Sequence, residues 1–222
     1  MATISRSART DGEITRARIL KTAGELFAIH GFADMQNKSI AAHAQVDMAS
    51  INYHFGSRKG LYQAVLVEAH HSLLNSKELL ALAESNISAE KKLHWIFRVV
   101  VANAKHKESW YIRVLSREFL SPSQHLQTVV GRDLAPKLLT IKSILGEVVG
   151  VDAHNPVLDR CLLSVMAPCI VMLVSGSINA GPISQVMKTP EEQLVEHMMT
   201  FAMAGLHATR EMLKQQKQTE DP

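Results

Sequence analysis

Asn52, Tyr53 and His54 place an amide, a phenol and an imidazole side by side, and the cations Arg58 and Lys59 follow closely. An amide can pair with a base edge, and a phenol or an imidazole can donate a hydrogen bond to a phosphate oxygen. The two cations lie at the expected start of a helix, where free N–H groups favour a bound phosphate. These residue types, in this order, indicate contact with a nucleic acid.

Two short helices are expected to position these side chains. Helical periodicity predicts one helix over residues 36–43 and another over 48–54, with Asp47 as N-cap of the second. Only four residues separate the two helices, which is the length of a tight helix-turn-helix connection. In that motif the second helix lies in the major groove of DNA. The sequence therefore predicts a DNA-contacting helix that ends with the Asn-Tyr-His run.

The side chains of this second helix are expected to divide by direction. Ile51 and Phe55 hold the helix on its own core, whereas the small Ala49 and Ser50 let its backbone approach DNA. Three alternatives stay open: packing of Tyr53 on the first helix, a structural hydrogen bond for His54, and a solvated face for Lys59. The predicted DNA contacts are Lys38, Ser39, Ser50, Asn52, Tyr53, His54, Arg58 and Lys59.

The remainder of the chain also has helical periodicity, and no stretch alternates in the way that a strand requires. We expect an all-α protein with a three-helix N-terminal head and a larger helical array behind it, about nine helices in total. The expected helices span residues 12–30, 36–43, 48–54, 58–80, 88–106, 110–120, 126–149, 155–177 and 189–216.

Composition argues against several other classes of protein. The two cysteines, Cys161 and Cys169, both lie in one apolar run, which does not suggest a disulfide framework and fits a reducing compartment. That run, residues 161–174, is short for a membrane span, and the N-terminus lacks the apolar core of a secretory signal. We therefore expect a cytoplasmic protein with no membrane partner.

Motifs that would support catalysis are missing from the sequence. There is no G-x-S-x-G, no glycine-rich phosphate loop and no Cys/His pair with the spacing of a zinc site. We expect no enzyme activity, no cofactor and no bound metal.

Charge is concentrated at the N-terminus. Residues 1–22 hold five basic and two acidic residues, so this segment accounts for the net charge of +3 of the whole chain. A basic arm beside the predicted DNA-contacting helix is consistent with phosphate binding. A solubilising N-terminal tail is an equally good interpretation of the charge alone.

The last two expected helices are apolar on more than one side. Because a single core covers one face of a helix, a second copy of the chain is the economical cover for the other face. The alternative is one thick core within a monomer. The predicted dimer-interface residues are Val165, Leu173, Leu194, Met198, Phe201 and Gly205.

Three stretches resemble the TetR family of bacterial transcriptional regulators. TRARILKTAGELFAIHGF is similar to the first helix of that family, IAAHAQV to its second, and INYHFGSRKGLY to the end of its recognition helix and the entry to the fourth helix. This chain has Gln45 where the family often has glycine, Asn52 where it commonly has tyrosine, and Arg58 where it usually has lysine. The stretch WYIRVLSREFLSPS also resembles a subgroup whose sixth helix carries an Arg-Glu pair followed by proline.

The resemblance implies a homodimer with a DNA-binding head at residues 1–58, a connecting helix at about 58–80, and a ligand-binding and dimerisation domain over 59–222. It further implies a repressor that a small, at least partly apolar molecule releases from a palindromic operator. The candidate pocket residues are Trp95, Trp110, Tyr111, Arg113, Arg117, Met166, Cys169 and Met172. The alternative function is an all-helical carrier or enzyme with a front end that only resembles a helix-turn-helix.

Overall fold

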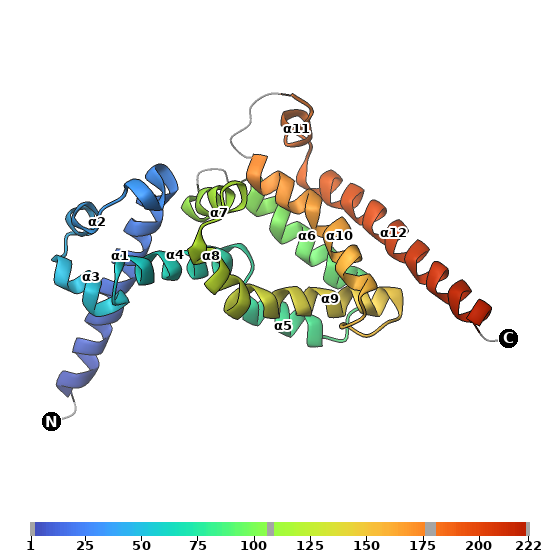
Figure 1. Cartoon of the computed structure of the whole chain (residues 1–222), viewed down its shortest axis with the longest axis horizontal. Coiled ribbons are helices and arrows are strands. Elements are labelled where there is room, and N and C mark those ends of the chain that lie inside the picture. The colour runs from blue at the N-terminus through green and yellow to red at the C-terminus, as the bar shows by residue number, and fades with distance from the viewer. Residues whose placement is uncertain (1–2, 106–108, 176–180, 221–222) are drawn as a thin grey trace. The chain divides into compact units, whose positions relative to one another are not determined.

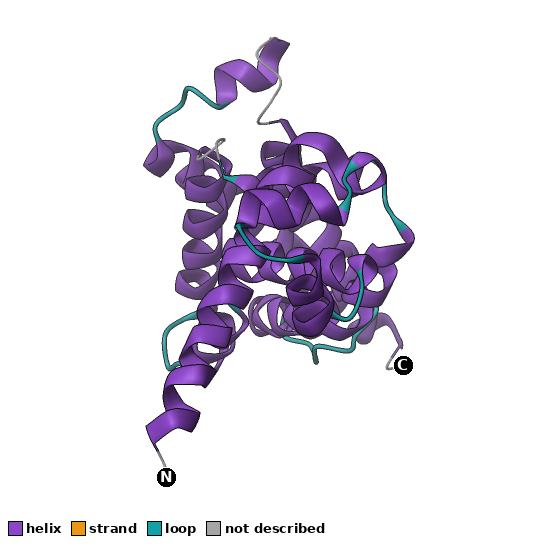
Figure 2. Cartoon of the chain, turned by 90° about the vertical axis from the view of Figure 1, so that its left-hand side faces the viewer, coloured by secondary structure: helices purple, strands orange, loops and turns teal. Residues whose placement is uncertain are grey.

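The computed structural model describes residues 3–105, 109–175 and 181–220, and over these residues it contains helices and connecting turns but no strand (Figure 2). The all-α prediction is therefore confirmed. The elements, labelled in Figure 1, are α1 (Thr3–Asp34), α2 (Asn37–Ala44), α3 (Met48–Phe55), α4 (Arg58–Leu73), α5 (Ser76–Glu84), α6 (Ala89–Lys105), α7 (Trp110–Leu120), α8 (Gln124–Val129), the π-helical turn η1 (Val130–Leu134), α9 (Ala135–Val149), α10 (Val157–Val174), α11 (Gly181–Val186) and α12 (Glu191–Glu220).

The chain forms two compact units. The first contains α1 to α4 up to Ser72, together with α7 and α8, and the second contains α5, α6 and α9 to α12. Helices α7 and α8 thus pack with the N-terminal head, although the sequence suggested a single boundary near residue 58.

The core of the first unit joins α1 to the two short helices of the head. Ile19 and Phe27 of α1, Ile40 of α2 and Ile51 of α3 are at most 1% exposed. The ring of Phe27 meets that of Tyr62 on α4 edge to face, with 4.9 Å between the centroids. Burial of these large apolar side chains provides the main stabilisation of the unit.

A buried carboxylate ties α7 and α8 to α4 within the first unit. The hydroxyl of Tyr62 donates a hydrogen bond of 2.6 Å to Oε1 of Glu118, and the backbone N–H and hydroxyl of Ser123 donate bonds of 3.0 and 2.9 Å to Oε2. Burial, followed by the bond to Glu118, raises the pKa of Tyr62, so the phenol stays protonated and acts as the donor.

The second unit has an apolar core in which two lysines are buried. Nζ of Lys92 donates to the carbonyl of Ala83 at 2.8 Å and to the Glu147 carboxylate, and Nζ of Lys137 donates to the carbonyl of Leu74 at 2.5 Å. Burial lowers the pKa of Lys137. Both ammonium groups satisfy carbonyls at or near a helix C-terminus, which explains their place in an apolar interior.

Several helix boundaries differ from those expected. The predicted continuous helix over 58–80 is wrong: α4 ends at Leu73, and the side chain of Asn75 caps α5 by accepting a bond of 2.9 Å from the N–H of Lys77. The predicted helix over 126–149 is likewise interrupted by η1, just before Pro136 in the first turn of α9. Helix α1 begins earlier than expected and bends at Gly31, where φ is +77°.

One described helix, α10, is apolar and long enough to cross a membrane by length and composition, with a mean hydropathy of 2.0. A core helix has the same composition, and α10 packs against α6, α9 and α12, with Cys161, Val165, Cys169 and Met172 buried. A single helix of this kind is weak evidence for a membrane protein.

Candidate nucleic-acid interface

The turn between α2 and α3 is tight and has a defined geometry. Gln45 adopts a left-handed conformation, with φ 53° and ψ 50°, and its N–H bonds to the carbonyl of Ala42. The N–H of Val46 bonds to the carbonyl of Ala41 at 3.0 Å, which closes the C-terminal end of α2. The chain then enters α3 directly, so the two helices form the expected helix-turn-helix.

The N-terminus of α3 is capped from within the protein. Oδ1 of Asp47 accepts hydrogen bonds of 2.6 Å from both the N–H and the hydroxyl of Ser50. The hydroxyl bond, followed by the backbone bond, lowers the pKa of Asp47. The Asp47 cap predicted from the sequence is therefore confirmed, and the hydroxyl hydrogen of Ser50, one of the predicted DNA contacts, is engaged inside the helix cap.

The N-terminus of α2, in contrast, has no side-chain cap. Gln36 precedes the helix with extended backbone angles and makes no capping bond through its side chain. The first N–H groups that bond to a carbonyl at this helix end are those of Ser39 and Ile40, which both bond to Gln36. The N–H groups of Asn37 and Lys38 come before them and are therefore available to an anion. The side chains of Lys38 and Ser39 are exposed at the same helix end.

The outer face of α3 carries polar side chains. Asn52 is exposed, and Tyr53 is 85% exposed. An exposed phenol of this size has no role in the core of the unit. The alternative in which Tyr53 packs on α1 is therefore not supported, because its described ring contact is with the neighbouring His54, at 5.0 Å between centroids.

His54 and Phe55 join the end of α3 to α1. Both rings are half-buried, and the guanidinium of Arg16 lies over the ring of Phe55 at 5.1 Å from its centroid. A Cβ placed on Gly12 would lie 4.0 Å from Cε1 of His54. This position supports a partly structural role for His54. The side chains of Arg6 and Arg9, the outer part of the predicted basic arm, lie outside the described ones.

Of the two cations that follow α3, only Lys59 is exposed. The guanidinium of Arg58 lies over the ring of Phe32 at 4.3 Å and donates to the carbonyls of Phe32 and Ala33. Arg58 therefore has its partners at the C-terminal end of α1, and the geometry favours a structural role rather than the phosphate contact suggested by the sequence.

One exposed side chain on α3 is not among the DNA contacts predicted from the sequence. Met48, the first residue of the helix, is 49% exposed, and the next residue, Ala49, is also exposed. From the sequence, Ala49 was expected only to allow close approach of the backbone, and Met48 was assigned no role. The position of Met48 at the first turn of the expected DNA-contacting helix was the available signal.

The eight candidate pocket residues do not converge on one site within either unit. Trp110, Tyr111, Arg113 and Arg117 belong to the first unit, and the others to the second. The ring of Trp110 lies against Gly24 on α1, and Nη1 of Arg117 donates to the carbonyl of Ile29 at 3.3 Å. Both residues therefore connect α7 to α1.

The pocket candidates of the second unit do not share one hollow. Trp95 and Met166 pack on the apolar core to which Cys169 and Met172 belong, but Trp95 also lines a surface hollow between α6 and α12, together with Arg98 and Glu192. Burial raises the pKa of the Cys169 thiol to about 12, which leaves it protonated and unreactive near neutral pH.

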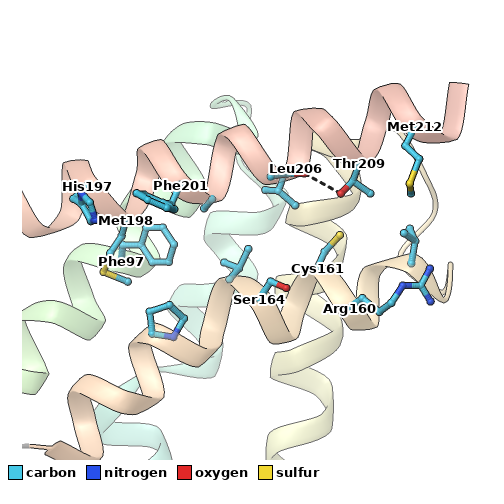
Figure 3. A pocket seen from close by; sticks show the side chains of 15 residues that line it. Phe97, Arg160, Cys161, Ser164, His197, Met198, Phe201, Leu206, Thr209 and Met212 are labelled. Carbon is cyan, nitrogen blue, oxygen red and sulfur yellow. Dashed lines mark hydrogen bonds between the residues drawn. The ribbon is translucent and has the colours of Figure 1, made fainter. Parts of the chain in front are cut away.

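An apolar groove of about 550 Å³ runs between α10 and α12. Figure 3 shows the side chains of the two helices facing each other across it, with Phe97 of α6 at its floor. Phe201 is 71% exposed there. Of the predicted dimer-interface residues, Val165, Met198, Phe201 and Gly205 line this groove, whereas Leu194 is buried in the core and Leu173 packs against it.

Within the described part of the chain, no group of three or more His, Cys, Asp or Glu side chains is arranged to hold a metal ion. The exposed faces of α2 and α3 and the two hollows on the second unit are candidate surfaces for a partner.

Two family models match this chain. The model for bacterial regulatory proteins of the TetR family matches residues 19–65, and the model for the C-terminal domain of the HTH-type transcriptional dual regulator CecR matches residues 89–206. The second match alone covers more than half of the chain. The fold and the helix-turn-helix are those of a DNA-binding transcriptional regulator, and the chain belongs to the TetR family, with a C-terminal domain of the CecR kind.

Individual curated proteins match this chain over only part of its length and at low sequence identity. The probable HTH-type transcriptional regulator YttP of Bacillus subtilis is 24% identical over 135 residues, which are 60% of this chain and 64% of that protein. UidR of Escherichia coli is 32% identical over 60 residues, which are 27% of this chain and 31% of that protein. The chain thus spans less than two thirds of the length of these relatives.

Solved structures share the fold. FadR of Bacillus subtilis, solved in complex with stearoyl-CoA, has a TM-score of 0.67 at 16% identity and covers 85% of this chain and 98% of its own. A TetR-like regulator from Rhodococcus sp. RHA1 has a TM-score of 0.62 at 14% identity and covers 87% of this chain and 96% of its own. At these identities the likeness establishes the fold alone.

Proposed function

We propose that this protein is a homodimeric repressor that binds a two-fold symmetric DNA operator and leaves it when a small molecule binds the second unit. The exposed face of α3 carries this proposal, because Asn52 and Tyr53 point outward from a helix held in a tight helix-turn-helix. A polar, unpaired face on an otherwise well-packed unit fits the base edges and phosphates of the major groove.

Phosphate contacts at both ends of the motif would orient α3 on the duplex. The uncapped N-terminus of α2 offers free N–H groups beside Lys38 and Ser39, and Lys59 is exposed at the start of α4. Because each neutralised phosphate releases counterions, affinity should fall steeply with salt concentration. Tyr53 belongs to this phosphate set, and Asn52 to the base-contacting set.

The groove between α10 and α12 is the proposed dimer surface. Its lining is mostly apolar, and the small Ala202 and Gly205 leave space for a partner helix. Two copies related by a two-fold axis would bury the exposed Phe201, and two heads would then face two half-sites. Leu173 and Leu194 contribute through the core beneath this surface.

The effector is proposed to be at least partly apolar, because the core of the second unit is built almost entirely from apolar side chains. Trp95 and Met166 remain candidate contacts in that unit. We place the protein in the cytoplasm, where operator DNA is accessible. A carrier or enzyme is the competing function, and the family membership of the chain favours the regulator.

Selection of bound sequences from a random duplex pool, with the purified full-length protein at physiological salt, tests the proposal. We expect recovery of a two-fold symmetric site, with affinity that falls steeply as salt is raised. Tyr53→Phe should weaken binding to all duplexes alike, whereas Asn52→Ala should relax sequence preference at one position of each half-site. A pool that shows no enrichment over a parallel selection without protein would rule out the regulator and favour the carrier.

A further inference from the structure

The first turn of α3 presents an apolar surface where a DNA-contacting helix is usually polar. Met48 is 49% exposed and Ala49 is exposed beside it, whereas Ile51 on the same helix is fully buried. The core of the unit therefore takes its apolar contact from Ile51 and leaves half of the Met48 side chain uncovered. Removing this exposed apolar area from water, by contact with a partner, would be favourable.

The polar groups of the same turn do not offer a phosphate contact. The Ser50 hydroxyl, which could donate to a phosphate, donates instead to Asp47, and the Asp47 carboxylate would repel a phosphate. No cation is present among residues 47–53. The first turn is therefore unsuited to the DNA backbone and suited to an apolar feature of the bases.

The major groove contains one apolar group at base edges, the C5-methyl of thymine. The N-terminal residues of a recognition helix are those that contact base edges. One turn further along α3, Asn52 is exposed, and an asparagine amide pairs bidentately with N6 and N7 of adenine. Met48 and Asn52 are four residues apart, about 6 Å along the helix axis, so both can reach neighbouring base pairs.

We propose that Met48 and Ala49 contact thymine methyl groups and that Asn52 contacts an adenine, so that each half-site contains neighbouring A·T base pairs. This inference rests on the proposed function and specifies how its sequence preference arises. Met48 and Asn52 are then the residues that determine specificity, and Lys38, Ser39 and Lys59 only orient the helix.

The experiment uses the duplex selected by the full-length protein. Each thymine of one half-site is replaced in turn by deoxyuridine, which removes only the methyl group, and each adenine by 7-deazadeoxyadenosine, which removes only the N7 acceptor. We expect deoxyuridine to weaken wild-type binding roughly fourfold at one or two positions, the effect of one buried methyl-sized group.

Variants assign the contacts to residues. At one of these positions, Met48→Ala should bind the thymine and deoxyuridine duplexes with equal affinity. Asn52→Ala should bind with equal affinity whether the contacted base is adenine or its 7-deaza analogue. Leu80→Ala is the control, because Leu80 is 51% exposed on α5 in the second unit. Met48→Leu keeps an apolar side chain and should keep the thymine preference, which separates methyl contact from loss of folding.

The outcomes are distinguishable from failure of the proposed function. If a symmetric site is selected but no deoxyuridine substitution weakens binding, or if the penalty persists unchanged in Met48→Ala and Ala49→Gly, the thymine assignment is overturned while the regulator stands. A selected half-site with cytosine in place of the expected thymine would also overturn it. If no site is selected at all, the proposed function is refuted, and the thymine assignment, which depends on it, is refuted with it.

Discussion

Gln45 adopts backbone angles that a side chain disfavours. Its φ of 53° lies in the left-handed region, which costs an L-residue roughly 1–2 kcal/mol and costs glycine almost nothing. The turn between α2 and α3 requires this conformation, because the N–H groups of Gln45 and Val46 close the C-terminal end of α2. The glutamine is therefore a local source of strain at the centre of the DNA-binding motif.

Gln45→Gly should raise the free energy of unfolding by about 0.5–1 kcal/mol, since relief of the left-handed strain exceeds the greater flexibility that glycine adds to the unfolded chain. Chemical denaturation of the full-length protein measures this change. Gln127→Gly, at an exposed position inside α8, is the control and should lower stability by about 1 kcal/mol. A destabilising effect at Gln45 would contradict the strain argument.

His125 is a second residue with a testable environment. The centroid of its ring lies 4.5 Å from that of Phe32, and its buried Nδ1 has no hydrogen-bond partner among the residues that the structure describes. Burial, followed by the nearby charge of Lys59, lowers the pKa of this imidazole from 6.5, with Arg58 acting in the same sense and Glu118 opposing it. The folded protein therefore resists protonation that the unfolded chain accepts.

Stability should consequently fall as pH falls below about 6.5 towards the folded-state pKa, because the unfolded state binds the proton first. His125→Phe removes this group and keeps an aromatic ring beside Phe32. Thermal unfolding at pH 7.5 and 5.5 should show a smaller loss of Tm for the variant than for the wild type. His154→Phe, at an exposed turn of the second unit, should leave the wild-type loss intact.

At the scale of elements, the end of α3 and the start of α4 approach each other very closely. A Cβ built on Gly60 would lie 2.1 Å from the carbonyl oxygen of Phe55, and the N–H of Gly60 bonds to the hydroxyl of Ser57 at 3.0 Å. Neither atom in the predicted clash belongs to a flexible side chain, so one of the two helices must move to admit any other residue.

Gly60→Ala should therefore lower the free energy of unfolding by about 2–3 kcal/mol, as expected for an overpacked contact, and should weaken DNA binding by displacing α3. Gly131→Ala is the matched control, because nothing lies within 4 Å of its Cβ position. Denaturation and operator titration of both variants give the comparison. Equal stability of the two variants would show that α4 accommodates the methyl group freely.

Helix periodicity in the sequence predicted most elements, since an apolar stripe and capping residues are local properties. The interruption at Leu74 and Asn75 was not predicted, because apolar residues continue on both sides of it. The capping role of Asn75 is evident only from the structure, in which α4 ends at Leu73 and α5 begins as a separate helix. The position of Arg58 was also unpredictable, because its partners lie on α1, more than twenty residues earlier in the chain.

At the scale of the whole molecule, the proposed function requires two copies. The groove between α10 and α12 leaves Phe201 71% exposed, which is unusual for a large apolar ring unless another surface covers it. The affinity of the dimer for a two-fold site then depends on the groove as well as on α3. The groove links the two heads, so the second head binds its half-site from a position close to it once the first head is bound.

Phe201→Glu should convert the protein to a monomer at micromolar concentration, because two carboxylates would be buried in the interface. Binding to the full palindrome should weaken roughly a hundredfold, towards the affinity for a half-site. Sedimentation velocity and operator titration measure the two effects. Leu80→Glu, at a position that is 51% exposed but lies outside the groove, should change neither. A Phe201→Glu dimer with full affinity would refute the assignment of this groove.

The sequence by itself determined the helical class, the helix-turn-helix, its Asp47 cap and the family, because these depend on residues close together in the chain. Tertiary structure alone decided which neighbours each helix meets. It turned Arg58 inward, packed α7 with the head, divided the eight pocket candidates between the two units, and left Met48 and Phe201 exposed. The physical reason is that periodicity shows which face of a helix is apolar, whereas burial of that face depends on helices distant in sequence.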